Sequence, residues 1–102
     1  MKVYLDDERK APSGWFQTRT AFETIDLLNK KNVVELSLDH DLGDDKVFGT
    51  GYDVLLHIEK EMHLNNKKPP EKIKVHSANS GARIKMELAI RSIKSSEKEI
   101  FV

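Results

Sequence analysis

Two pairs of aspartates have the type and spacing that a cation site requires. Asp6 and Asp7 end one short apolar run, and Asp39 and Asp41 end another. Such runs are typical of buried parallel strands, and parallel sheets bind ligands beyond the carboxyl ends of their strands. If the two strands are neighbours, these carboxylates converge and repel one another unless a cation or a proton compensates. Hard oxygen ligands favour magnesium, manganese or calcium, and we expect Mg²⁺ or Mn²⁺ at Asp6, Asp7 and Asp39.

The alternative is a purely structural role, in which these aspartates only form turns. Any single aspartate at a strand end is more often a turn former than a ligand. Two clusters at two strand ends favour the functional interpretation. Asp44 and Asp45 lie in a glycine-flanked loop and are expected to be solvated surface charges.

Two histidines lie at the same expected edge of the sheet. His40 directly follows Asp39, and His76 lies near the end of the strand expected over residues 73–78. An imidazole here could act as a general acid or base on a phosphodiester, because its pKa lies near neutrality. Alternatively, each histidine hydrogen-bonds an aspartate and takes no part in chemistry.

Polar and basic side chains could complete a phosphate site. Ser77 and Asn79 follow the fourth strand, where a hydroxyl and the amides of a helix start can hold phosphoryl oxygens. Both residues also suit the capping of that helix. Arg83 lies in its first turn, where a cation opposes the helix dipole, so an anionic ligand is inferred there. Arg9 could reach the same ligand.

The elements that position these residues alternate between strand and helix patterns. Capping boxes at Thr20 and Thr50 predict two helix starts, and Asn79 or Ser80 can start a third. We expect a three-layer α/β sandwich with a mostly parallel sheet of four or five strands. The expected strands are residues 3–5, 15–18, 33–38 and 73–78, and residues 100–102 could form a final edge strand.

Composition excludes several classes of function. The 102 residues suit one domain spanning 1–102, with 17 basic and 17 acidic side chains, so we expect no bulk DNA binding. The absence of cysteine excludes disulfides and zinc–thiolate sites and favours a cytoplasmic location. No apolar run approaches the ~20 residues of a membrane span, and we expect no membrane contact.

Five sequence blocks together resemble a known family. They are LDDER at 5–9, SLDHDLG at 37–43, GYDVL at 51–55, HSAN at 76–79 and AIRSI at 89–93. The chain resembles the flavodoxin-like receiver domain of two-component signalling, and most closely its divergent branch, the cyclic-phosphate processing receiver domain. The resemblance spans nearly the whole chain, and the blocks are specific only in combination.

The resemblance implies roles for the matching residues. Asp6 and Asp7 match the acidic pair that holds magnesium, and Asp39 matches the phosphoacceptor. Ser77 matches the hydroxyl that binds the phosphoryl group. The residues that match the divergent branch, and not ordinary receivers, are His40, Asp41, His76 and Asn79.

The departures from the receiver pattern shape the functional hypotheses. The first and last receiver helices have no match, and neither does the lysine after the fifth strand. One hypothesis is a metal-dependent enzyme of cyclic phosphodiesterase type, with Asp39, His40 and His76 as catalytic residues, acting on a nucleotide or RNA-end phosphate. A second is a signalling receiver that is phosphorylated on Asp39. A third is a non-catalytic phosphate sensor that presents its surface to a protein partner.

Overall fold

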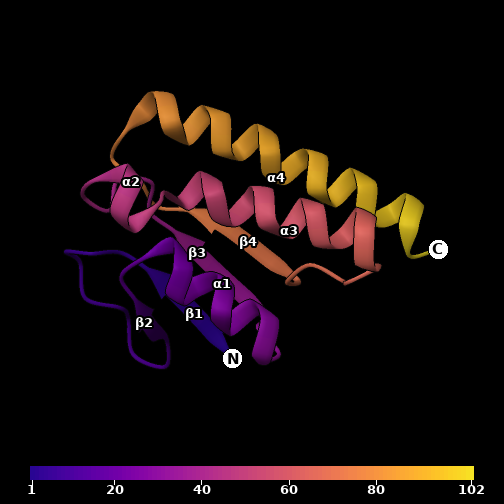
Figure 1. Ribbon diagram of the computed structural model, residues 1–102, viewed down its shortest axis with the longest axis horizontal. Coiled ribbons are helices and arrows are strands. Elements are labelled where there is room, and N and C mark those ends of the chain that lie inside the picture. Colours follow the sequence, from indigo (N-terminus) through magenta and orange to yellow (C-terminus); the bar gives the residue numbers. More distant parts are fainter.

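The computed structural model describes residues 1–102 as a four-stranded parallel sheet with helices packed on it (Figure 1). The strand order is β2-β1-β3-β4, which confirms the expected receiver-like α/β fold. The elements along the chain are β1 (Lys2–Leu5), β2 (Phe16–Thr18), α1 (Ala21–Lys30), β3 (Glu35–Leu38), α2 (Asp45–Phe48), α3 (Gly51–Asn65), β4 (Lys72–Val75) and α4 (Ser80–Ile100).

The strand register brings the predicted site residues to one level of the sheet. Leu5 of β1 pairs with Leu38 of β3, which pairs in turn with Val75 of β4. The next residue of each strand therefore leaves the sheet beside the others. The backbone ladder continues one step further, since Asp39 N donates to Leu5 O and His76 N donates to Leu38 O, both at 2.9 Å.

The helices cover one face of the sheet, so the sandwich has two layers and not the three that we expected. The chain moves across the sheet in one direction from β2 to β3 to β4, and right-handed crossovers then place α1 and α3 on the same side. α3 packs between α1 and α4 (Figure 1). The buried apolar strand side chains on the covered face are Val3, Leu5, Leu36, Leu38 and Val75.

Caps fix where the helices begin. The hydroxyl of Thr20 accepts from Glu23 N at the start of α1, and Thr50 and Asp53 form a complete capping box at the start of α3. The oxygen Oδ1 of Asn79 accepts from Ala82 N and starts α4. These three starts agree with the sequence patterns.

Two local expectations were wrong. The loop after Gly43 contains a short helix, α2, whose first turn is capped by Asp44. The expected edge strand over residues 100–102 is not formed, because α4 continues to Ile100, and Ile100 and Phe101 are partly buried against the core. The charged residues before Ile100 are good helix formers, and the apolar helix face continues past Ile93. No helix combines the length and the apolar character that a membrane span needs.

The start of α3 lies so close to Asp39 that only glycine fits. The N–H of Gly51 donates to His40 O at 3.3 Å, and a methyl group on Gly51 would overlap the carbonyl oxygen of Asp39. This contact ties the position of Asp39 to the helix.

Replacing this glycine is expected to destabilise the domain and to displace Asp39. We expect Gly51→Ala to lower the free energy of unfolding by about 1–3 kcal/mol, because the clash is with backbone. Gly81→Ala in α4 is the matched control, since a methyl there meets only Asn79 Oδ1 at 3.8 Å. The control should raise stability by roughly 0.4–1 kcal/mol. Urea denaturation measures both, and equal effects would contradict the proposed contact.

Candidate metal and phosphate site

Three carboxylates meet at the carboxyl ends of β1 and β3. Oxygens of Asp6, Asp7 and Asp39 lie within 4.8 Å of one another, although the side chains of Asp6 and Asp39 are 1% and 8% exposed. They border a cleft of about 180 Å³. The residues that line this cleft are Asp6, Asp7, Glu8, Arg9, Asp39, Asp41, Ala78 and Asn79.

Asp6 is held as a carboxylate by the protein itself. Its Oδ1 accepts from the backbone N–H groups of Glu8 and Arg9, both at 2.8 Å. Its Oδ2 accepts from His76 Nε2 at 3.0 Å and from Arg9 Nη1 at 3.4 Å. Burial by itself would raise the pKa of Asp6, but these donors outweigh burial and hold its pKa below the ordinary value.

Asp39 has the opposite electrostatic environment. Only the backbone N–H of His40 donates to its carboxylate, at 2.8 Å. Burial raises the pKa of Asp39, and the nearby charge of Asp6 raises it further. Asp39 therefore carries an electrostatic cost that a cation or a proton would remove.

The donor set fits a hard divalent cation. All three groups are carboxylates, and their oxygens are near enough to share an ion after small side-chain adjustments, given bonds of about 2.0–2.6 Å. Asp6 is oriented by its own hydrogen bonds, as metal ligands commonly are. The three aspartates could therefore bind a divalent cation.

His76 supports Asp6 and carries no charge in this arrangement. Because Asp6 is ionised and can only accept, Nε2 of His76 carries the proton, and Nδ1 accepts from the hydroxyl of Ser37 at 2.7 Å. The ring stacks on Tyr4 with centroids 4.2 Å apart. Burial lowers the pKa of His76, which favours this neutral form. Both ring nitrogens are thus engaged within the chain.

The lowered pKa of His76 predicts how stability depends on pH in metal-free protein. The unfolded chain binds a proton near pH 6.5, whereas the folded chain binds it only at lower pH. We therefore expect stability to fall as the pH drops through 6.5 toward the folded pKa. Denaturation at several pH values in EDTA checks this.

Substitutions separate the contribution of His76 from that of His57, whose pKa burial also lowers. The His76→Gln variant should lose the part of the pH dependence of stability that comes from His76. The His57→Gln variant should lose the part that comes from His57. Nitrogen-15 NMR of the ring should show the Nε2-protonated tautomer of His76. An Nδ1-protonated ring would contradict the hydrogen-bond chain.

His40 forms a second histidine–carboxylate pair, with one ring nitrogen left free. Its Nδ1 lies 2.7 Å from Asp41 Oδ1, and Asn79 Nδ2 donates to Asp41 Oδ2 at 3.3 Å. The carboxylate of Asp41 can only accept, so Nδ1 of His40 is the donor. This hydrogen bond holds the pKa of Asp41 below its ordinary value. The lone pair of His40 Nε2 meets no donor from the chain and can take up a proton.

The remaining candidates divide between the cleft and its surroundings. Arg9 lines the cleft, and its Nη1 also donates to His76 O at 2.9 Å. Ser77 is buried and accepts from Asn79 N, without lining the cleft. Arg83 pairs with Glu87 at 2.8 Å, one turn along α4, and also lies outside the cleft.

Sequence reasoning missed three residues of the site. Glu8 lines the cleft, and its position directly after Asp6-Asp7 was a usable signal. Ser37 and Tyr4 orient His76 from the uncovered face of the sheet. Nothing in a single sequence connects these two side chains to a histidine in a later strand.

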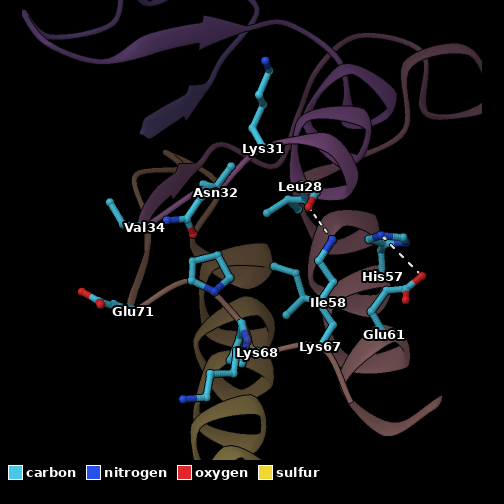
Figure 2. Close-up of a pocket in the computed structure, with 13 residues that line it drawn as sticks. Leu28, Lys31, Asn32, Val34, His57, Ile58, Glu61, Lys67, Lys68 and Glu71 are labelled. Atoms are coloured by element: carbon cyan, nitrogen blue, oxygen red, sulfur yellow. Dashed lines mark hydrogen bonds and ion pairs between the residues drawn. The ribbon is translucent and has the colours of Figure 1, made fainter. Parts of the chain in front are cut away.

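A second pocket, of about 210 Å³, lies at the opposite end of the sheet and contains none of the clustered aspartates (Figure 2). The ammonium of Lys67 reaches the carbonyl of Leu28 at 2.5 Å, near the end of α1. His57 lies beside it and 4.0 Å from Glu61. Since a lysine at a helix end satisfies otherwise unpaired carbonyls, this pocket has a structural explanation.

The fold and the acidic cluster define a receiver-type domain. The family model "Cyclic-phosphate processing Receiver domain" matches residues 1–92 of the 102, and the chain belongs to this family. No curated protein and no solved structure matched the chain.

Proposed function

We propose that this domain binds a cyclic or terminal phosphate of a nucleotide or RNA end, through a divalent cation held by Asp6, Asp7 and Asp39. The observation that carries the proposal is the pair of buried carboxylates with opposite environments. Asp6 is fixed as an anion, while the pKa of Asp39 is raised by burial and by Asp6. A divalent cation would offset most of the negative charge of this cluster and could in turn bind an anionic ligand.

The cleft offers groups of both signs to a phosphate. A bound cation would polarise the phosphoryl oxygens. Arg9 and Asn79 line the same cleft and can donate to the oxygens that the cation does not reach. Asp41, on the cleft wall, links the phosphate position to His40.

The His40–Asp41 pair supports opening of a 2′,3′-cyclic phosphate. Water would add to phosphorus as one ring P–O bond breaks, which yields a phosphomonoester and a free ribose hydroxyl. Nε2 of His40 would accept the proton of the water and return it to the leaving ribose oxygen. Asp41 would stabilise the imidazolium between these two steps.

A mixture of nucleoside 2′,3′-cyclic phosphates with Mg²⁺ tests the proposal. Binding should raise the melting temperature only when the metal is present, and chromatography should show ring-opened product. A temperature shift without product would favour the sensor hypothesis and leave the binding site in place. The absence of both the temperature shift and the product would contradict the proposal.

Phosphorylation of Asp39 is the second candidate, favoured by its position in the acidic cluster. Incubation with acetyl phosphate and Mg²⁺, followed by intact mass measurement, should add one phosphoryl group if this candidate is correct. An unchanged mass would exclude acetyl phosphate as a donor and favour the cyclic-phosphate proposal.

A further inference from the structure

The face of the sheet opposite the helices has no covering layer. Alternation along the strands directs Tyr4 and Ser37 to this face, away from the core side chains of β1 and β3. We call it the open face. The residues that form it are Lys2, Tyr4, Trp15, Gln17, Glu35, Ser37, Lys72 and Lys74.

A row of rings crosses the open face and ends at the acidic site. The ring of Trp15 meets Tyr4 edge-on with centroids 6.3 Å apart, and Tyr4 stacks on His76. His76 in turn donates to Asp6. His76 therefore connects the open face to Asp6 at the edge of the cleft.

Lysines surround the aromatic row. The ammonium groups of Lys2 and Lys74 lie 5.7 and 5.3 Å from the ring of Trp15. Lys72 adds a third cation, and Glu35 is the only acidic residue of the face, 3.9 Å from Lys72. The face is thus basic although the whole chain has a net charge of zero.

Aromatic rings beside cations are the features that bind single-stranded nucleic acid. Bases stack on the rings, and lysines meet the backbone phosphates. Other four-stranded sheets bind two or three RNA bases on exposed aromatics in this way. A surface that binds a protein partner is expected to be apolar and weakly charged. The lysines of the open face do not fit that description.

We propose that the open face binds the last nucleotides of a single-stranded RNA whose 3′-terminal phosphate lies in the acidic cleft. This inference deepens the proposed function and rests on it for the position of the RNA end. Lys2 precedes Asp6 by four residues, or about 13 Å of strand, which leaves room for a short oligonucleotide.

Trp15 is the only tryptophan and reports directly on the open face. The probe is a six-residue oligouridylate, with a 3′-hydroxyl in one sample and a 2′,3′-cyclic phosphate in the other. We expect both to quench Trp15 fluorescence, less so at high salt because phosphate contacts release counterions. With Mg²⁺, the cyclic phosphate should bind more tightly.

Lys74→Glu tests the surface, and Lys60→Glu on α3 is the matched control. Both lysines are exposed, and only Lys74 lies on the open face. We expect Lys74→Glu to weaken RNA binding at least tenfold and Lys60→Glu to change it less than twofold. Equal effects, or no quenching of Trp15, would overturn the proposal.

Two further results distinguish this inference from the proposed function. Trp15 fluorescence that changes with protein concentration alone would show that a second copy covers the face and would overturn RNA binding. The two oligonucleotides could bind equally well in Mg²⁺ while Lys74→Glu still weakens the binding of both. In that case the placement of the RNA end and the proposed function are wrong. Binding of RNA by the face would then stand alone.

Discussion

Asp39→Asn is expected to abolish every metal-dependent effect and to stabilise the metal-free domain. The amide keeps the shape of the carboxylate and still accepts from the N–H of His40. It removes a carboxylate charge that is unfavourable here, since burial and the nearby Asp6 raise the pKa of Asp39. Above its ordinary pKa this group costs folding free energy, so its removal stabilises the folded state at neutral pH. Each 1 kcal/mol gained raises the melting temperature by roughly 4–8 °C.

Thermal unfolding in EDTA and in Mg²⁺ measures both effects of Asp39→Asn. At a hundred times the dissociation constant, Mg²⁺ should stabilise the wild-type domain by about 2.7 kcal/mol and the variant by none. Asp45→Asn on exposed α2 is the control, and it should keep the Mg²⁺ response. If the Asp39→Asn variant still responds to Mg²⁺, Asp39 is not a ligand of the cation.

His40→Gln is expected to reduce cyclic-phosphate opening by about 100-fold or more, the usual contribution of a general acid–base group. The amide can still donate to Asp41, but it cannot carry a proton. Mg²⁺ binding, measured by the shift in melting temperature, should remain.

His63→Gln is the control for His40→Gln, since His63 is exposed near the end of α3. Its rate should equal that of the wild type. A His40→Gln rate within about threefold of the wild type would instead point to another proton carrier. His76 is a poor candidate for that role, because both of its ring nitrogens are already engaged.

The sheet and the acidic cluster were predictable because they depend on local patterns. Apolar runs that stop at Asp6 and Asp39 mark strand ends, and parallel strands end at one edge. The capping-box patterns at Thr20 and Thr50 predicted where α1 and α3 begin, and both threonines cap these helices. The end of α4 was harder to predict, because Ile100 fits both the apolar face of a helix and a short strand.

The sequence by itself determined which residue types follow each strand, and hence that Asp6, Asp7 and Asp39 share an edge. The tertiary structure alone decided their electrostatics, because pKa depends on burial and on neighbours from distant segments. It also decided that Ser37 and Tyr4 hold His76 and that one face of the sheet is uncovered. These features arise from the register and the crossover direction, which join strands tens of residues apart and leave no periodicity in the sequence.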